Sequence, residues 1–325
     1  MDPFPLLRHL SDGEFHSGAD LARQIQVSRG TIWNALRAAR QFGVEVFAVR
    51  GRGYRLPVPP DWLDRGRILD ALGPQESLFR LEILDTTPST NSLLLERAQA
   101  GAAHGTVIAA ELQTQGRGRL GRSWQGELGG GLAFSLLWRF REGVGFLGGL
   151  SLAAGCAVAR AIDRLGAEEV GLKWPNDVLW RGGKLAGILI ESRGDLLGPT
   201  ACVIGVGLNV RASAALRAQV AQPVADLAEA LPRPTDRSRI FAAVLAALGE
   251  TLEAFGRHGF APFRDEWQQR NVWQGRQTYL NLPSGETVAG VCEGVAEDGS
   301  LLLRAPAGLR RYPTGEMEFP AAPRS

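Results

Sequence analysis

Apolar and polar residues follow three different patterns along the 325 residues of this chain. Near the amino end, apolar positions recur every three to four residues, which is typical of short amphipathic helices. From about residue 62 to 271, strand-like apolar runs alternate with stretches of helical period, which predicts an α+β core on a mixed sheet. From 275 to 319, short apolar runs separated by Pro-Ser-Gly and Glu-Asp-Gly turns predict a small β-barrel.

The amino-terminal pattern predicts two helices followed by a hairpin. Ser17 and Asp20 begin the first helix as a capping box, and Val27 and Ser28 lead into the second. The expected elements are helices over 17–26 and 29–40, a strand over 44–49, a turn over 50–53 and a returning strand over 54–56. Two helices joined by a tight turn, with a basic outer stripe and a wing, predict a winged helix-turn-helix.

The charge distribution supports an anionic partner for this region. The net charge of +2 conceals a local excess, because residues 15–56 contain seven arginines and two acids, Asp20 and Glu45. A basic end on an otherwise neutral chain favours DNA binding. The residues predicted to contact DNA are Ser28, Arg29, Thr31, Asn34, Arg37, Arg50 and Arg52.

The central region is expected to fold as strands over 105–111, 132–140, 185–191 and 202–210 and helices over 91–100, 147–165 and 238–255. No apolar run reaches the roughly 18 residues of a membrane span, and the amino end lacks the pattern of a signal peptide. The expected compartment is therefore the cytoplasm. Cys156, Cys202 and Cys292 lack the spacing of a zinc site or a disulfide framework and are predicted to be buried.

Lysine is almost absent from the chain. Of 36 basic residues, only Lys173 and Lys184 are lysine. In a composition that otherwise uses arginine, two retained lysines favour sites that need a compact ammonium on a flexible stem. Two surface lysines kept by chance are the alternative.

A loop rich in glycine and arginine lies between two expected strands. Residues 113–124 read QTQGRGRLGRSW, so several glycine amides and three arginine side chains are able to converge on an anion. No Gly-Lys-Ser/Thr follows, and the loop does not open a helix, so it is neither a Walker A loop nor a dinucleotide-binding loop. A flexible basic loop without a catalytic role is the alternative.

The segment Lys173-Trp174-Pro175-Asn176-Asp177 is predicted to end a strand in a rigid turn. A tight turn at 181–183 then returns the chain at Lys184, which places Lys184 close to Asp177. Such a pair is often a plain salt bridge, but beside an anion-binding loop it suits a phosphate site, with Asp177 as a candidate magnesium ligand.

Two further segments suit a polar or flat ligand. Ser89-Thr90-Asn91 begins a helix, where hydroxyl groups are most often caps but also hold polar ligand groups. The segment 205–210, GVGLNV, is a strand whose glycines permit close approach of a ligand, with Asn209 as a polar contact.

Taken together, these segments resemble the biotin protein ligase family. The ordered set is STN at 89–91, GRGRLGRSW at 116–124, KWPND at 173–177, GGKLAGILIE at 182–191 and GVGLNV at 205–210. With GEFHSGADLARQIQVSR near the amino end and GRGYRLP in the wing, the resemblance is to the branch that is also a repressor, and it covers about residues 12–320. Leu120 departs from the pattern, because a polar or basic residue often stands there.

The resemblance implies three domains. These are a winged helix-turn-helix over 1–61, a mixed-sheet α/β ligase domain similar to class II aminoacyl-tRNA synthetases over 62–272, and an SH3-like β-barrel over 273–325. It also implies a biotin--[acetyl-CoA-carboxylase] ligase that uses biotin, ATP and Mg²⁺ to form biotinyl-5′-AMP and then modifies a carrier lysine.

By the same resemblance, site roles fall on particular residues. The catalytic residues would be Lys184, Arg119 and Asp177, the last also a magnesium ligand. The biotin-binding residues would be Ser89, Thr90, Asn91, Gln113, Gly116, Arg117, Gly118, Arg119 and Lys184, with Leu189, Gly205 and Gly207 beside the apolar chain of biotin. The adenylate contacts would be Asn176, Asn209, Arg122 and Trp124.

The implied partners are the biotin carboxyl carrier protein of acetyl-CoA carboxylase, operator DNA upstream of biotin synthesis genes, and a second copy of the chain when adenylate is bound. No membrane partner is expected. Three alternatives stay open at this stage: a lipoate or octanoate transferase, a repressor without catalysis, and a ligase whose winged helix no longer recognises an operator. Gly30 and Trp33 in the recognition helix bear on the third, because they alter the surface that reads bases.

Overall fold

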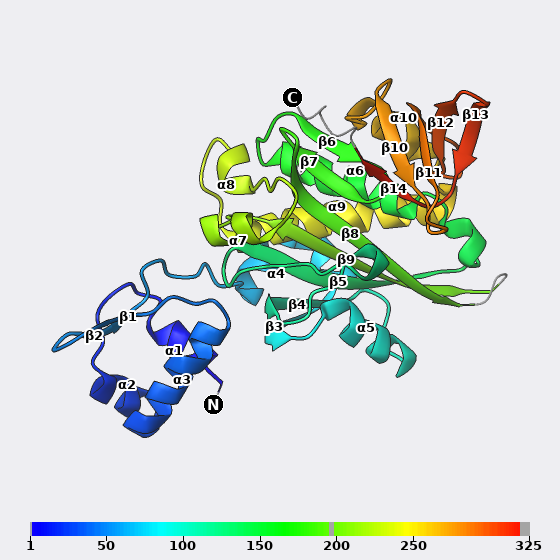
Figure 1. Cartoon of the computed structure of the whole chain (residues 1–325). Helices are drawn as coiled ribbons and strands as arrows, with labels where there is room; N and C mark the ends of the chain where they lie inside the picture. Colours follow the sequence, from blue (N-terminus) through cyan, green and yellow to red (C-terminus); the bar gives the residue numbers. More distant parts are fainter. Residues whose placement is uncertain (1, 195–197, 319–325) are drawn as a thin grey trace, which may run out of the picture.

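The amino-terminal region is a small helical unit at one end of the molecule (Figure 1). The computed structural model describes residues 2–194 and 198–318. The amino-terminal elements are α1 (Phe4–His9), α2 (Gly18–Gln24), α3 (Arg29–Gln41), β1 (Phe47–Val49) and β2 (Gly53–Arg55). Ser17 caps α2 by accepting from the Asp20 N–H, and Ser28 caps α3 by accepting from the Thr31 N–H. The predicted winged helix-turn-helix order is therefore present.

The expected strand over 44–49 is wrong in its first half. Only Phe47–Val49 pairs with Gly53–Arg55, in antiparallel register. Val46 is buried in the core of this unit, which also holds Leu21, Ile32 and Leu36. The segment before Phe47 packs inward where the short returning strand offers no partner, so it does not join the hairpin.

A seven-stranded mixed sheet forms the centre of the molecule, in the order β3-β4-β5-β9-β8-β7-β6. Its strands are β3 (Arg80–Thr87), β4 (Thr106–Gln113), β5 (Gly131–Phe140), β6 (Val170–Lys173), β7 (Asp177–Trp180), β8 (Gly183–Gly194) and β9 (Thr200–Asn209). The helices are α4 (Arg65–Leu72), α5 (Thr90–Gln99), α6 (Leu150–Arg164), α7 (Ala214–Gln219), α8 (Leu227–Ala230), α9 (Arg237–His258) and α10 (Ala261–Arg270), with 3-10 turns η1 (Gly73–Leu78), η2 (Arg119–Gly121) and η3 (Val144–Leu147). Among these seven described strands, β3 and β4 are the one pair that runs parallel.

Helices cover both faces of this sheet. On one face α5 packs Leu94 against Ile108, Leu137 and Val203. On the other face the main core joins the sheet to α4, α6, α9 and α10. The strands and helices expected in this region are all present, with ends shifted by at most three residues. The helix expected over 147–165, for example, begins at Leu150 as α6, and the short 3-10 turn η3 precedes it.

A five-stranded antiparallel sheet follows the central region, in the order β13-β12-β11-β10-β14. Its strands are β10 (Gln277–Asn281), β11 (Thr287–Val295), β12 (Leu301–Ala305), β13 (Gly308–Tyr312) and β14 (Glu316–Glu318). Leu280, Cys292, Leu303 and Met317 are buried and belong to the main core. The absence of helical period in this stretch is confirmed for the residues that the structure describes, up to 318.

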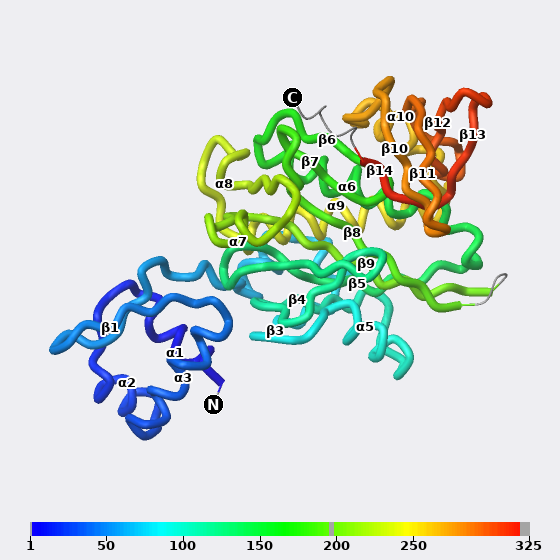
Figure 2. Tube along the Cα trace, in the orientation of Figure 1, coloured from blue at the N-terminus to red at the C-terminus, as the bar shows by residue number. Residues whose placement is uncertain are grey.

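Buried polar contacts join the linker before α4 to the central sheet, and Figure 2 shows this path of the chain. Arg237 and Glu111 form an ion pair of 2.9 Å (Nη1 to Oε2) whose side chains are both 0% exposed. Glu111 also accepts from the Leu63 N–H at 2.7 Å, and the Asp61 carboxylate accepts from the Arg237 N–H at 2.8 Å. The amino-terminal unit is further held by an ion pair of Arg8 with Asp85.

Candidate functional site

One cavity of about 890 Å³ gathers most of the residues that the sequence indicated. It opens over the central sheet and is bounded by the start of α5, the glycine–arginine loop, the turns around Lys173 and Lys184, and β14. The predicted site residues on its wall are Ser89, Thr90, Asn91, Gln113, Arg117, Gly118, Arg119, Arg122, Trp124, Asn176, Asp177, Lys184, Leu189, Gly205, Gly207 and Asn209. Gly116 is the one that is absent from the wall: a Cβ there would collide with the Trp124 carbonyl, so its small size serves the loop itself.

The start of α5 presents several linked polar groups to the cavity. Ser89 is the N-cap and accepts from the Ser92 N–H. The Gln113 Oε1 accepts from the Thr90 N–H at 2.8 Å and lies 3.1 Å from Thr90 Oγ1. A buried hydroxyl on β5, that of Ser135, lies 2.5 Å from Asn91 Oδ1 and 2.7 Å from Thr90 Oγ1. The side chains of this end are thus held in place before any ligand arrives.

Two glycines of β9 make room for side chains on the cavity floor. A Cβ at Gly205 would lie 2.8 Å from Asn91 Cγ, and a Cβ at Gly207 would lie 2.6 Å from Trp124 Cδ2. Both distances are shorter than van der Waals contact. The glycines that the sequence assigned to close approach of a ligand therefore also permit close approach of Asn91 and Trp124.

The glycine–arginine loop is folded on itself. The Trp124 N–H donates to the Gly116 carbonyl at 2.8 Å, and the Gly118 N–H donates to the Arg122 carbonyl at 2.7 Å. Leu120 has a positive φ of 53° and is 62% exposed, so the residue that departs from the family pattern stands at the outer tip of the loop.

The three arginines of this loop differ in their partners. Arg117 pairs with Glu191 at 2.8 Å, and Arg122 pairs with Glu316 of β14. Arg119 has no ion pair with any residue that the structure describes. Burial lowers the pKa of the Arg119 guanidinium below its ordinary value, partly offset by the negative charges of Glu316 and Asp177. Arg119 is thus the arginine of the loop whose charge is left for an anion.

Lys184 and Asp177 meet as the turn predicted. Lys184 Nζ lies 2.7 Å from Asp177 Oδ1, with the side chains 18% and 13% exposed. The same ammonium lies 5.8 Å from the ring centroid of Trp124. Lys173, at the end of β6, also lines the cavity and lies 5.6 Å from the ring centroid of Trp273. Burial lowers the pKa of Lys173, and the charge of Asp177 opposes that shift.

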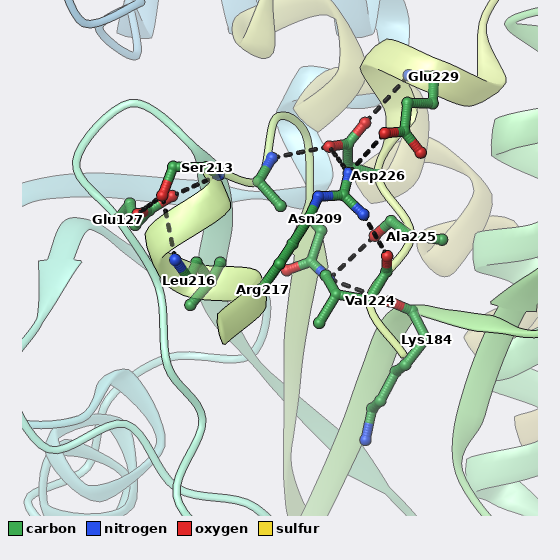
Figure 3. A network of polar contacts seen from close by, with 11 residues as sticks. Glu127, Lys184, Asn209, Ser213, Leu216, Arg217, Val224, Ala225, Asp226 and Glu229 are labelled. Carbon is green, nitrogen blue, oxygen red and sulfur yellow. Dashed lines mark hydrogen bonds and ion pairs between the residues drawn. The ribbon is translucent and has the colours of Figure 1, made fainter. Parts of the chain in front are cut away.

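A covering loop, residues 211–226, borders the cavity on the side of Lys184 (Figure 3). Asp226 closes its base by accepting from the Ala212 N–H at 2.8 Å and from Arg217 Nη2 at 2.7 Å. The Lys184 N–H donates to the Pro223 carbonyl at 2.8 Å, and the Lys184 carbonyl accepts from Ala225. The loop is thus pinned to the backbone of Lys184, while the Lys184 side chain points away from the Asp226 cluster in Figure 3.

The two asparagines predicted as adenylate contacts also hold the backbone in place. Asn209 donates to the carbonyls of Lys184 and Ala225, both at 3.1 Å. Asn176 donates to the Ile188 carbonyl at 2.9 Å. Their amide hydrogens bind protein, so the roles of these side chains toward a ligand stay predictions.

Several cavity residues were missed in the sequence. They are Ser135 behind the polar end and, on the wall, Phe134, Leu216, residues 219–224, Trp273 and residues 315–318. Ser135 carried a weak signal, because it is a lone hydroxyl within an apolar strand. The covering loop and the carboxyl-terminal residues carried none, since the strands between them and the motifs must first assemble.

The outer face of α3 is exposed as predicted. Trp33 is 54% exposed, and Arg37 lies over its ring at 5.1 Å. In the wing, the Arg52 guanidinium lies 4.3 Å from the ring centroid of Phe15. Ser28 and Thr31, two predicted DNA contacts, are engaged in capping α3, and Arg29, Asn34 and Arg50 are exposed.

The cysteines agree with the prediction that they are buried. The three cysteines are free and buried, and burial raises the pKa values of Cys156 and Cys202 to about 12. Within the described residues, no helix is long and apolar enough to cross a membrane, and no group of three or more His, Cys, Asp or Glu side chains is arranged to hold a metal.

Sequence comparisons match three segments of the chain to known families. Residues 83–209 match the Biotin/lipoate A/B protein ligase family, residues 5–55 match an HTH domain, and residues 275–319 match the Biotin protein ligase C terminal domain. These matches follow the helical unit, the central sheet and the carboxyl-terminal sheet in order.

Curated relatives and solved structures give the same grouping. The chain is 35% identical over 320 residues to the bifunctional ligase/repressor BirA of Escherichia coli (strain K12), covering 98% of both chains. It is 38% identical over 251 residues to the biotin--[acetyl-CoA-carboxylase] ligase of Mycobacterium tuberculosis (strain ATCC 25618 / H37Rv), covering 75% of this chain and 90% of the relative. The structure of the biotin protein ligase from Aquifex aeolicus in complex with biotin and ATP is similar with a TM-score of 0.63 and 28% identity, over 74% of this chain and 97% of that one.

Proposed function

This chain belongs to the biotin protein ligase family, in its bifunctional ligase/repressor branch, and from this premise we propose its reactions and partners. It joins biotin to ATP as biotinyl-5′-adenylate and transfers the biotin to a lysine of a carrier protein. It also binds operator DNA and represses biotin synthesis genes. A single observation carries the enzymatic part: one cavity unites a pre-ordered polar end, the half-buried Lys184–Asp177 pair and Arg119, which forms no ion pair with the described residues.

The polar end at α5 binds the ureido ring of biotin. Ser89, Thr90 and Gln113 offer hydroxyl and amide groups that are already oriented by hydrogen bonds, so a buried ureido group finds partners without reorganisation of the site. Leu189 and the glycines of β9 flank the apolar chain of the ligand.

The first half-reaction needs positive charge at a phosphate. An oxygen of the biotin carboxylate forms a bond to the α-phosphorus of ATP, and the bond from that phosphorus to pyrophosphate breaks. Two anions must therefore approach each other, so the barrier is largely electrostatic. Lys184, held by Asp177, and Arg119 stabilise the charge that develops on the phosphate oxygens.

The second half-reaction needs a neutral amine. The ε-amino group of the carrier lysine attacks the acyl carbon of the adenylate, the bond from that carbon to the phosphate oxygen breaks, and AMP leaves. The nitrogen loses a proton to solvent as the amide forms. Water would hydrolyse the same mixed anhydride. The glycine–arginine loop and the covering loop on either side of the cavity limit the access of water to it.

Magnesium suits this site as part of the nucleotide substrate. The cavity places the single carboxylate of Asp177 beside Lys184, and the described residues offer no cage of carboxylates. Mg²⁺ is usually held by one or two carboxylates together with substrate phosphates, and it neutralises charge on them. Asp177 would hold the ion, and phosphate oxygens and water would supply the remaining ligands.

The partners and domain architecture complete the proposal. The carrier is the biotin carboxyl carrier protein of acetyl-CoA carboxylase, and adenylate binding favours a homodimer on DNA, in the cytoplasm. The division into 1–61, 62–272 and 273–325, the likeness of the central domain to class II aminoacyl-tRNA synthetases, and the SH3-like nature of the carboxyl-terminal sheet belong to this proposal. Separate cores before and after residue 62 support the first boundary.

The experiment is incubation of the purified protein with biotin, Mg-ATP and a biotin carrier domain, with acceptor mass measured by mass spectrometry. We expect a gain of one biotin that requires ATP and is lost in Lys184→Ala. Arg181→Ala is a matched control, because Arg181 is an exposed cation three residues away and outside the cavity wall. A gain with lipoate in place of biotin, or no gain at all, would contradict the proposal.

A further inference from the structure

The two lysines of the chain line the same cavity. Lys173 ends β6 and Lys184 is the second residue of β8. Strand β7, between them in the sheet, places Asp177 opposite Lys173 in register. In a chain with 34 arginines, both remaining ammonium groups thus face one ligand space. The sequence marked both lysines as candidates for a site but indicated a specific role only for Lys184.

Their charges are balanced differently. The Lys184 ammonium is neutralised by Asp177 at 2.7 Å. Lys173 is half-buried, and no carboxylate lies within 4.0 Å of its ammonium among residues 2–194 and 198–318. Its contact is the ring of Trp273, 5.6 Å away. The charges of Asp177 and Glu316 act on this ammonium from farther away, but neither carboxylate forms an ion pair with it. A partly desolvated ammonium without a directly paired carboxylate is stabilised when a ligand brings further negative charge.

The position of Lys173 in the sheet indicates which part of the ligand it contacts. In the sheet order, β6 lies at the edge away from β4, which carries Gln113 at the end proposed for biotin. Lys173 therefore lies beyond Lys184 as seen from that end. Past the α-phosphate, the substrate continues as a neutral adenosine and as the anionic β- and γ-phosphates. A positive charge complements the phosphates.

We propose that Lys173 is a further catalytic residue, which binds the β- and γ-phosphates of ATP and the pyrophosphate that leaves. This inference rests on the proposed function. Lys173 acts in adenylate formation and has no part in transfer, because pyrophosphate has departed before the carrier lysine attacks. Loss of a charge-assisted contact weakens pyrophosphate binding by about ten- to a hundredfold.

The first test compares Lys173→Met with the unaltered protein in three measurements. These are calorimetric binding of inorganic pyrophosphate with Mg²⁺, ATP–pyrophosphate exchange with biotin, and transfer from purified biotinyl-adenylate to a carrier domain. We expect the first two to weaken by about ten- to a hundredfold and transfer to change less than about twofold. Equal losses in exchange and transfer, or unchanged pyrophosphate binding, would overturn the inference.

A second measurement needs no substitution. Because the chain has two lysines, acetic anhydride labels few sites, and peptide mass spectrometry assigns each of them. We expect inorganic pyrophosphate with Mg²⁺ to protect Lys173 and biotin alone to leave it reactive. Labelling of Lys173 at the same rate with and without pyrophosphate would refute the inference even if Lys173→Met failed to fold. If pyrophosphate still protects Lys173 but the protein shows no reaction with biotin, the proposed function is refuted and the inference about Lys173 is not.

Discussion

Replacing Glu111 by glutamine tests the buried ion pair beneath the domain junction. In the structure Glu111 and Arg237 are both 0% exposed and 2.9 Å apart. Arg237 also donates from Nε to the Gly131 carbonyl at 3.0 Å, so the guanidinium cannot swing out to water without losing that bond. Glutamine keeps the shape of Glu111 but leaves the Arg237 charge without a counter-ion.

The expected loss of unfolding free energy follows from the burial of the Arg237 charge once its counter-ion is removed. Removing one partner of a fully buried pair costs about 3–5 kcal/mol of unfolding free energy, because the remaining charge stays desolvated. An exposed pair costs much less. Glu293→Gln is the matched control, since Glu293 pairs with Arg304 at 2.8 Å with side chains 32% and 59% exposed, and its loss should cost under about 1 kcal/mol.

The assay is urea unfolding followed by tryptophan fluorescence, with a double-mutant cycle that adds Arg237→Met. We expect a coupling energy of about 2 kcal/mol or more between the two positions. If Glu111→Gln costs no more than Glu293→Gln, or if the coupling is near zero, the pair does not hold the junction as described.

Three other predictions concern the cavity, a titrating histidine and the DNA-binding face. Gly207→Ala should lower the rate of adenylate formation by about a hundredfold with little loss of stability, because the added Cβ displaces the Trp124 ring; unchanged pyrophosphate exchange would contradict this. Burial lowers the pKa of His104 in the folded protein, and the charge of Arg139 adds to this shift. The neutral imidazole therefore stabilises the fold at pH values above about 6.5, the pKa of histidine in the unfolded chain, and this stability is lost as the pH falls below it. Urea unfolding measured at pH values above and below about 6.5 should show this decrease in unfolding free energy, and His104→Gln should abolish the decrease. An identical pH dependence in both proteins would count against the assignment. On DNA selected from a random library, Arg37→Ala should reduce the slope of log affinity against log salt concentration by about one. Trp33→Ala should reduce the preference for selected over random DNA sequences. If fluorescence anisotropy shows neither change, α3 does not contact DNA.

The sequence by itself determined the local parts of this protein. The helix caps at Ser17 and Ser28 and the pairing of Lys184 with Asp177 involve residues close in the chain, and the structure contains each of them. Their geometry depends on backbone periods and short turns, which neighbouring residues fix. The strand predicted over 44–49 was too long, because its length depends on how many residues of the returning strand, Gly53–Arg55, are available to pair with it.

Only the tertiary structure decided how these parts meet. The packing of α5 on β5 brings Ser135 behind Asn91, and the carboxyl-terminal sheet places Glu316 of β14 against Arg122. These contacts join residues 44 and 194 positions apart. Polar residues at such separations carry no mutual pattern in the sequence, because their partners are selected by the packing of a whole sheet.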